Sequence, residues 1–471
     1  MSDVVATSQQ GLTDKYHPYP EYKDSGVEWY RSIPADWGVE RLKFSVRKLE
    51  SGTSVNAMDT PAGLGQVGVL KTSAVYTGEF RRSENKAVLE SDLARVSCPV
   101  KNGCLVVSRM NTPDLVGAAG LVTEDAESIY LPDRLWQVHV TDGAAKFIHY
   151  WTLTPEYRNQ VRLVCTGTSS SMQNLSQEQF LNFLIPALGE DEKNSITAFL
   201  DYETARIDRL IAQQQRLIEL LKEKRQAMIS HAVTKGLNPN APMKDSGVEW
   251  LGQVPEHWIV CKIKNLAAVI SKGTTPSTIG AEFIDEGVRF LKAENIGKSN
   301  IVSIDPEFFI SEDVDRQISR SQLKENDVLV IIAGATTGLA SVLQKELLPA
   351  NTNQAVSFIR LFEPLHSKWV LHWLSTTPVQ KTIWMGAVQA AQPNLSMENL
   401  GNIPIVIPPI NEIAAHLKHI ENKIVNFENL AEKAGVAIQL MQERRTALIS
   451  AAVTGKIDLR GWTPPAEEVA A

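Results

Sequence analysis

The sequence is poor in features that would place it outside the cytoplasm. No apolar run reaches the roughly 18 residues that a membrane-spanning helix needs, and the N-terminus lacks a basic stretch followed by an apolar one. Four cysteines in 471 residues are too scattered for a disulfide framework or a metal-binding quartet. These absences predict a cytoplasmic protein with reduced thiols. The cysteines are Cys98, Cys104, Cys165 and Cys261.

Common catalytic motifs are also missing. The chain has no phosphate-binding G-x-x-x-x-G-K-[ST], no G-x-S-x-G and no H-E-x-x-H. Residues 63–68 satisfy G-x-G-x-x-G, but they follow T-P-A and run into V-L-K-T-S-A-V, so no strand-to-helix turn is expected there. His416 and His419 lie one helical turn apart without an evident acidic or cysteine ligand nearby. The sequence therefore predicts no catalysis and no metal site.

Positive charge is scarce as well. The formal net charge is −7 and the isoelectric point is near 5.8. Nonspecific affinity for DNA comes mostly from Lys and Arg that neutralise phosphates, so this balance argues against a protein that coats DNA alone. Any DNA contact must be local or shared with a partner. The length and the 43% hydrophobic content indicate two to four soluble globular units.

The sequence contains an internal duplication. Residues 23–29 and 244–250 both read K-D-S-G-V-E-W, 221 positions apart. The register persists, since Gly52-Thr53 matches Gly273-Thr274 and the tryptophans Trp37 and Trp258 correspond. Each half then ends with N-L-S, a long helical pattern and A-V-T. A repeat this long implies two full domains related by pseudo-two-fold symmetry, because stacked arrays repeat every 20 to 50 residues.

Between these repeated segments, the two middles diverge strongly, roughly over residues 76–165 and 297–385. They contain short strand-like runs ended by Gly, Pro and Asn, together with helical patches. The predicted organisation is a tag at 1–36, a globular domain at 37–187, a helix at 188–236, a linker with the repeated tag at 237–257, a second domain at 258–408, a helix at 409–457 and a tail at 458–471.

Two long helices carry an apolar seam. Their 3-4 apolar spacing over about five heptads is typical of a coiled coil. Arg445 interrupts the second seam, Gly435 is interpreted as a close approach of the helices, and Ile211 and Ile218 lie off the first seam, where a second packing face is expected. The predicted seam residues are Ile196, Leu200, Ile207, Leu210, Leu217, Leu221, Ile413, Leu417, Ile420, Ile424, Phe427, Ile438 and Met441.

These patterns predict an α+β fold: two pseudo-symmetric, mixed α/β globular domains separated by two long antiparallel coiled-coil helices. Pro186 and the pair Pro408-Pro409 precede the helices, and Gly236 and Gly455 lie past their ends, as helix start and stop signals should.

Polar residues at predicted loops are the candidates for DNA contact. Arg can bond guanine bidentately and Asn can do so with adenine, while small hydroxyls and amides can donate to phosphate. For each residue, a solvated loop side chain is the alternative, and the repeated lysines could instead support the fold. The candidates are Lys71, Thr72, Arg109, Asn111, Ser169, Ser170, Gln173, Asn174, Lys292, Asn295, Thr336, Gln389, Gln392 and Asn394.

The order and spacing of these motifs resemble the specificity subunits of type I restriction-modification systems. The resemblance rests on the repeated K-D-S-G-V-E-W tag followed by I-P-x-x-W or V-P-x-x-W, on N-L-S before I-P, and on the helix ending in A-V-T, from about residue 20 to 460. One departure concerns the helix start, commonly I-P-L-P-P with E-Q after it in the family but I-P-A-L-G-E-D-E and I-P-P-I-N-E-I here.

The resemblance implies that each middle is a target recognition domain reading one half of a bipartite site in double-stranded DNA, with the helices holding the two apart. It implies two methyltransferase subunits and two restriction/translocase subunits as partners. S-adenosylmethionine, ATP and Mg would then be bound by those partners, and this chain would need no cofactor.

Two other functions compete with this one. A single-chain restriction-methyltransferase would need [ND]-P-P-[FYW], but the Pro-Pro pairs stand in I-P-P-I and T-P-P-A. A coiled-coil scaffold carrying two adaptor domains for protein partners is not excluded by composition.

Overall fold

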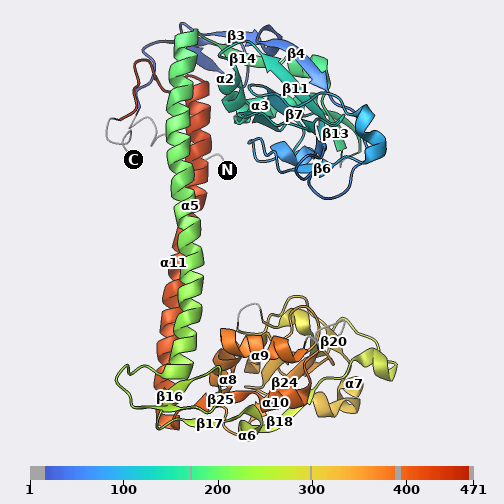
Figure 1. The fold of residues 1–471 in the computed structure, drawn as a ribbon, viewed down its shortest axis with the longest axis vertical. Coiled ribbons are helices and arrows are strands. Elements are labelled where there is room, and N and C mark those ends of the chain that lie inside the picture. The colour runs from blue at the N-terminus through green and yellow to red at the C-terminus, as the bar shows by residue number, and fades with distance from the viewer. Residues whose placement is uncertain (1–15, 170–171, 298–299, 388–393, 466–471) are drawn as a thin grey trace. The chain divides into compact units, whose positions relative to one another are not determined.

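The computed structural model describes residues 16–169, 172–297, 300–387 and 394–465, and side chains are described for these except at 166–169. The chain divides into two compact units (Figure 1). Unit 1 comprises Met1–Gln214 and Val436–Ala471, and unit 2 comprises Gln215–Gly435. Within the described ranges, no helix is long and apolar enough to cross a membrane.

Unit 1 is built on a four-stranded antiparallel sheet in the order β4-β11-β7-β9. Its central strand β7 is buried on both faces: Leu105 and Val107 join the core that contains Trp136, whereas Val106 joins a second core with Leu135. The strands are β4 (Val46–Ser51), β11 (Leu135–Val140), β7 (Leu105–Ser108) and β9 (Ala119–Leu121). Helices α2 (Ala145–Thr152) and α3 (Pro155–Val164) follow β11.

Unit 2 repeats this plan. Its sheet has the order β18-β24-β21-β22, and the central strand β21 alternates between two cores in the same way. The strands are β18 (Ala267–Lys272), β24 (Val356–Leu361), β21 (Val328–Ile331) and β22 (Ala340–Val342). Helices α8 (His366–Leu374) and α9 (Thr377–Ala387) follow β24 in the sequence, and the short helix α7 (Glu312–Gln317) precedes β21.

Each unit also has a smaller sheet with one parallel pair. In unit 1 its order is β10-β5-β6, where β10 is Ile129–Tyr130, β5 is Gly68–Leu70 and β6 is Asn85–Ala87. In unit 2 its order is β20-β19-β23, where β20 is Phe309–Ile310, β19 is Val288–Leu291 and β23 is Ala350–Thr352. The repeated sequences Leu70-Lys71 and Leu291-Lys292 end β5 and β19, so this part of the repeat fixes equivalent strand ends.

The repeated tags form hairpins and close each domain. The hairpin strands are β1 (Tyr22–Asp24), β2 (Ser32–Pro34), β15 (Met243–Asp245) and β16 (Gln253–Pro255). The start of each globular domain pairs antiparallel with its end, through β3 (Gly38–Arg41) with β14 (Leu184–Ala187), and β17 (Ile259–Lys262) with β25 (Pro404–Ile407). In each unit the divergent segment therefore lies between two strands that pair with each other.

The repeated N-L-S is a helix cap. Ser176 begins α4 (Gln177–Leu181) with its side chain accepting the backbone N–H of Gln179, and Ser396 begins α10 (Met397–Asn402) by accepting that of Asn399. The preceding leucines, Leu175 and Leu395, are buried. Ser at this position satisfies a backbone donor that the helix leaves unpaired, so both parts of the motif have a local structural role. A further short helix, α6 (Ile263–Leu266), follows β17.

The long helices α5 (Glu190–Lys235) and α11 (Ile410–Val453) pair antiparallel in each unit. In unit 1 the start of α5 packs on the end of α11, with Ile196 and Leu448 in one core. In unit 2 the end of α5 packs on the start of α11, with Val233 and Ile413 in one core. The helices end at the predicted glycines, Gly236 and Gly455, which have positive φ values of 78° and 72°.

Arg445, which interrupts the apolar pattern of α11, has an ion-pair partner. Its Nε lies 3.0 Å from a carboxylate oxygen of Asp208 in α5. The corresponding residues in unit 2, Arg225 and Glu428, lie 3.7 Å apart. Both pairs follow the same repeat offset of 220 residues, so the interruption of the seam is a repeated polar contact between the helices.

Two predicted seam positions are wrong. Leu210 and Leu217 are 39% and 41% exposed, whereas Ile211 and Ile218 are partly buried. The inward positions of α5 follow the 3.6-residue turn of a straight helix, and a strict 3.5-residue spacing drifts out of phase over several turns. The close approach predicted at Gly435 is also wrong, because a Cβ there would meet no described heavy atom within 4 Å.

The other predicted seam residues face inward. The buried ones are Ile196, Leu200, Ile207, Leu221, Ile413, Leu417, Ile420 and Ile424. Those partly buried are Phe427, Ile438 and Met441.

Substitutions at glycine should separate close packing from helix propensity. A Cβ at Gly52 would lie 1.7 Å from the carbonyl oxygen of Leu131, and one at Gly273 would lie 1.9 Å from that of Thr352. We expect Gly52→Ala and Gly273→Ala each to lower the free energy of unfolding by more than about 2 kcal/mol. Gly435→Ala is the matched control and should raise it by about 0.5–1 kcal/mol. Urea denaturation checks this, and wild-type stability for Gly52→Ala would contradict it.

Acid should weaken unit 2 through a buried histidine. Burial lowers the pKa of His372 in α8 to about 4, helped by the charge of Arg225. A folded pKa below the unfolded value of about 6.5 means that stability is present at neutral pH and is lost as the pH falls, because the unfolded chain takes up the proton first. The loss at pH 5 should be about 2 kcal/mol.

His372→Tyr should remove this part of the pH dependence, since Tyr150 occupies the equivalent place in unit 1 and donates to Asp201 over 2.7 Å. Unfolding free energies at pH 7 and pH 5 provide the test, with the exposed His231→Asn as control. An unchanged slope in His372→Tyr would show that another group causes it.

Candidate nucleic-acid interface

Lys71 and Thr72 lie where β5 ends in unit 1. The backbone N–H of Lys71 donates to the carbonyl of Glu84 over 2.9 Å. Its side chain contributes, after the nearer Lys86, to holding the pKa of Asp59 below its usual value. Thr72 begins a 3-10 turn, so both residues sit at a strand end where loops present side chains.

Asn111 joins Thr72 through a residue that the sequence did not single out. The hydroxyls of Thr72 and Tyr76 lie 2.7 Å apart, and the Asn111 amide donates to Tyr76 over 3.0 Å and to Ser108 over 3.2 Å. Asn111 is buried, and its amide oxygen accepts the N–H of Thr112. The network shapes the loop after β7, and Asn111 spends most of its bonding capacity inside the protein.

A hairpin brings Arg109, Gln173 and Asn174 to the same edge. Strand β13 (Met172–Asn174) pairs with β8 (Met110–Asn111) and with β12 (Thr166–Ser169), which places Gln173 opposite Asn111. The Arg109 Nε and the Asn174 Oδ1 are buried and have no hydrogen-bond partner among the described residues. An unpaired buried polar group costs about 1–3 kcal/mol, so this edge keeps two polar atoms whose hydrogen-bonding capacity the described residues do not use.

Lys292 is the repeat counterpart of Lys71, but its surroundings differ. Its ammonium lies 3.2 Å from the ring centre of Phe308 and 4.4 Å from that of Phe283. A cation over aromatic faces is stabilised there. Phe308 belongs to the divergent middle, and Phe283 stands where unit 1 has Ala62, so the repeat alone gave no sign of these rings.

Asn295 is buried and fully bonded within unit 2. Its amide donates to the carbonyls of Ser303 and Pro306, and its oxygen accepts the N–H of Lys292. These bonds assign Asn295 to shaping the turn after β19, and they leave little capacity for a base.

Thr336 and Asn394 lie at an edge of unit 2 equivalent to the hairpin edge of unit 1. Thr336 is exposed in the turn between β21 and β22. The exposed Asn394 forms an isolated antiparallel bridge with Ala333, as Asn174 pairs with Met110. Of the remaining candidates, Ser170, Gln389 and Gln392 lie outside the described residues, and only the backbone of Ser169 is described.

Neither the glycine motif nor the histidine pair forms a ligand site in the fold. Residues 63–66 lie before strand β5 and not before a helix. His416 is buried, with ring centres 5.6 Å from Trp258 and 5.9 Å from Trp369. In the described part of the chain, no group of three or more His, Cys, Asp or Glu is placed to hold a metal.

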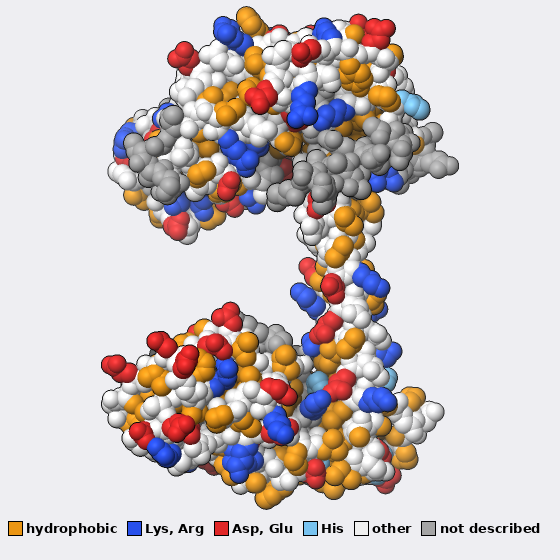
Figure 2. All heavy atoms as spheres, turned by 180° about the vertical axis from the view of Figure 1, so that it is seen from behind, with side chains coloured by type: hydrophobic (Ala, Val, Ile, Leu, Met, Phe, Trp, Pro, Cys, Tyr) orange, Lys and Arg blue, Asp and Glu red, His pale blue; other side chains and the backbone are white. Residues whose placement is uncertain are grey.

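Charged side chains of both signs are scattered over one face of the molecule (Figure 2). On the face shown in Figure 2, Lys and Arg side chains are interspersed with Asp and Glu over both units. Phosphate contacts on this face must therefore come from a few local cations.

Comparison with known proteins agrees with this architecture. Residues 255–436 match the family described as "Type I restriction modification DNA specificity domain". Over 340 residues the chain is 22% identical to the EcoBI specificity subunit of Escherichia coli, covering 70% of each protein. It is 20% identical over 438 residues to the putative MjaX specificity subunit of Methanocaldococcus jannaschii, covering 91% of this chain and 95% of that protein.

A solved structure titled for the complex assembly and conformational transition of the type I R-M system matches 90% of this chain and 99% of its own at a TM-score of 0.66, with 14% identity. The HsdS subunit of Thermoanaerobacter tengcongensis matches 90% and 98% at a TM-score of 0.50, with 16% identity. These likenesses support the fold. In its repeated tags and paired helices, in the domain matched over residues 255–436 and in its curated relatives, the chain is similar to the type I restriction-modification specificity subunits, a DNA-recognition and not a catalytic family.

Proposed function

We propose that units 1 and 2 each read one half of a bipartite DNA sequence. One observation carries the proposal: equivalent positions on the same scaffold present different side chains. The N–H of Leu175 donates to the carbonyl of Arg109, and the N–H of Leu395 donates to that of Ile332, both over 2.8 Å. Arg109 is partly exposed and can hydrogen-bond to a guanine edge, whereas Ile332 is buried in the core of unit 2 and leaves base contact there to its neighbours. Two such surfaces suit two different half-sites.

The reading edge of unit 1 is the hairpin β12–β13 with Arg109 and Asn174, and that of unit 2 is the turn with Thr336 beside Asn394. Bonds to DNA would satisfy the unpaired atoms of Arg109 and Asn174. Lys71 and Lys292 are proposed to contact phosphates near these edges.

Chemistry is proposed to reside on partner subunits in the cytoplasm. Two methyltransferases carrying S-adenosylmethionine would dock on the helices, and two restriction/translocase subunits using ATP and Mg would join them. The partners would also supply much of the positive charge that this acidic chain lacks.

Domain exchange tests the reading of half-sites. Replacing residues 37–185 with the matching domain of a relative should change one half-site and leave the other intact, because β3 and β14 close that domain on itself. Methylome sequencing of cells expressing the exchanged chain with its methyltransferase gives the outcome. The reciprocal exchange of residues 258–406 should alter only the other half. Changes in both half-sites from either exchange would refute two independent readers.

The helices are proposed to set the number of unread base pairs between the half-sites. A heptad inserted after Gln214 in α5 and another after Gly435 in α11 would fall at the boundary between the units. Each adds about 10.5 Å and turns the helix by only about 20°. At about 3.4 Å per base pair, the spacer should grow by two or three base pairs.

The half-site sequences should stay the same, as methylome sequencing can show. Insertion of one residue into each helix is the control, since it rotates the seam out of contact and should cost stability or activity. An active heptad variant with an unchanged spacer would mean that something other than helix length sets it.

A further inference from the structure

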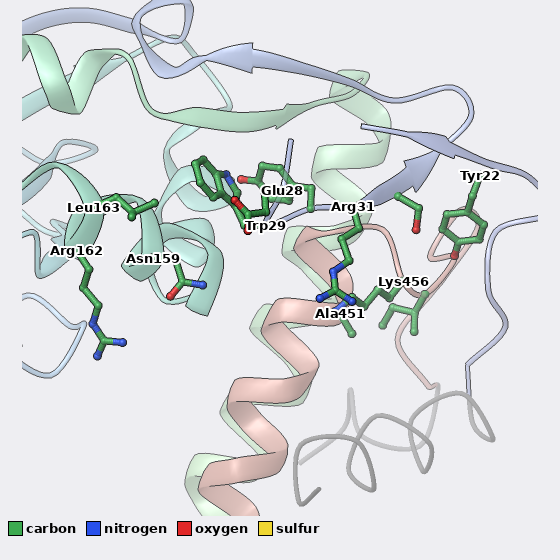
Figure 3. Close-up of a pocket in the computed structure, with 12 residues that line it drawn as sticks. Tyr22, Glu28, Trp29, Arg31, Asn159, Arg162, Leu163, Ala451 and Lys456 are labelled. Atoms are coloured by element: carbon green, nitrogen blue, oxygen red, sulfur yellow. The ribbon is translucent and has the colours of Figure 1, made fainter. Parts of the chain in front are cut away.

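A cavity of about 930 Å³ lies in unit 1 between the N-terminal tag, α3 and the end of α11 (Figure 3). Arg31 and Lys456 line one side near Ala451, and Arg162 and Leu163 of α3 line the other. Trp29 also lines the cavity, and Glu28 contributes its one carboxylate. Three cations against one anion make its lining locally positive in a chain of net charge −7.

Two of these cations have no ion-pair partner in the part of the chain that the structure describes: the side chains of Arg31 and Lys456. Arg162 has only a long contact, 3.9 Å to a carboxylate oxygen of Asp114, and both side chains are mostly exposed. Such a contact contributes little. The charge of the cavity is therefore available to a ligand.

Arg31 occupies a backbone position that disfavours it. Its φ is +55°, in the left-handed region where a side chain is strained. The repeat counterpart in unit 2 is Gly252 at φ +62°, the residue type that adopts this conformation freely. Unit 1 thus places a cation at the cavity at a conformational cost that unit 2 avoids.

The other lining positions differ between the units in the same direction. Lys456 directly follows the left-handed glycine that ends α11, and Leu237 directly follows the one that ends α5. Thr154 and Thr376 are equivalent, because each lies just before α3 or α9 and donates to a tryptophan carbonyl. In this alignment of the two helices, Trp384 is the counterpart of Arg162. Lys381 takes the place of Asn159, so unit 2 has one cation where unit 1 has three.

We propose that this cavity is a docking site for an acidic segment of a protein partner. Carboxylates would pair with Arg31, Lys456 and Arg162, since guanidinium groups bind carboxylates through paired, charge-assisted bonds. An apolar side chain of the segment would pack on Trp29 and on Leu163, which is 69% exposed. Because the site exists in one unit, it would bind one segment per chain, whereas the repeated surfaces of the two units could each take an equivalent partner.

The lining favours a peptide over DNA backbone. Glu28 lies on the wall and would repel a continuous line of phosphates, but a peptide can offer it a backbone N–H. The exposed Leu163 and the indole of Trp29 suit an apolar side chain and have no counterpart in a phosphodiester chain. None of the residues that line the cavity belongs to the β12–β13 hairpin proposed to read DNA, so the site extends the proposed function without depending on it.

Fluorescence anisotropy of the purified full chain with a labelled E-E-L-E-E-L-E-E peptide tests the proposal. The double variant R31G/K456L installs the residues of unit 2 and should weaken binding about tenfold or more, as expected for loss of charge-assisted bonds. The control variant K43L/R209A also removes one lysine and one arginine, at exposed positions of unit 1 outside the cavity, and should bind the peptide like wild type. Added salt should weaken wild-type binding and leave little effect in the double variant.

Arg31→Gly alone should also raise the Tm, because glycine relieves the left-handed strain. A fall in Tm would assign Arg31 a structural role and overturn the proposal. Equal peptide affinity of wild type and double variant would overturn it too. So would a double variant that keeps the peptide but loses a labelled random-sequence duplex, since the cavity would then be a phosphate site.

Discussion

Each unit depends on a contact between the tryptophan that follows its tag and the end of the long helix that belongs to the other repeat. Trp37 packs on Gly455, where a Cβ would come within 3.0 Å of the indole, and Trp258 packs on Gly236, where it would come within 3.2 Å. The glycine ends the helix by adopting a positive φ, and its missing side chain admits the tryptophan. Neither half of the sequence therefore contains all the parts of one unit, and the antiparallel pairing of α5 and α11 follows.

On this shared scaffold, equivalent positions carry different chemistry. Asp327 precedes β21 and forms a bidentate pair with Arg360 on β24. Burial raises the pKa of that carboxyl and the guanidinium opposes the shift. The equivalent places in unit 1 hold Cys104 and His139, whose ring nitrogen lies 3.3 Å from the thiol sulfur. Both units keep the same strand pairing and the same alternation of apolar side chains. Backbone hydrogen bonds and interchangeable hydrophobic side chains form these features, so the polar residues at the strand ends can differ.

The candidate interface was predictable in part. The residue types at strand ends and the N-L-S turn indicated loops, and the structure brings Thr72, Asn111 and Gln173 to one edge. In the structure the side-chain amides of Asn111 and Asn295 form hydrogen bonds within the protein. Residue type and loop position could not reveal these bonds. Tyr76 was missed because its role depends on meeting Thr72 and Asn111 across the fold. Contact with DNA remains a prediction for every one of these residues.

By itself the sequence determined the duplication, the two long helices with their end glycines, and the resemblance to type I specificity subunits, because these depend on repeated local signals: identical tags, helical apolar spacing and residues suited to turns. Only the tertiary structure decided which face of α5 is buried. The difference between 3.5 and 3.6 residues per turn adds up over many turns, and it leaves Leu210 and Leu217 exposed. The tertiary structure also decided which polar atoms stay unpaired and where Arg31, Arg162 and Lys456 meet. Those outcomes depend on contacts between residues far apart in the chain, and residue spacing alone does not specify such contacts.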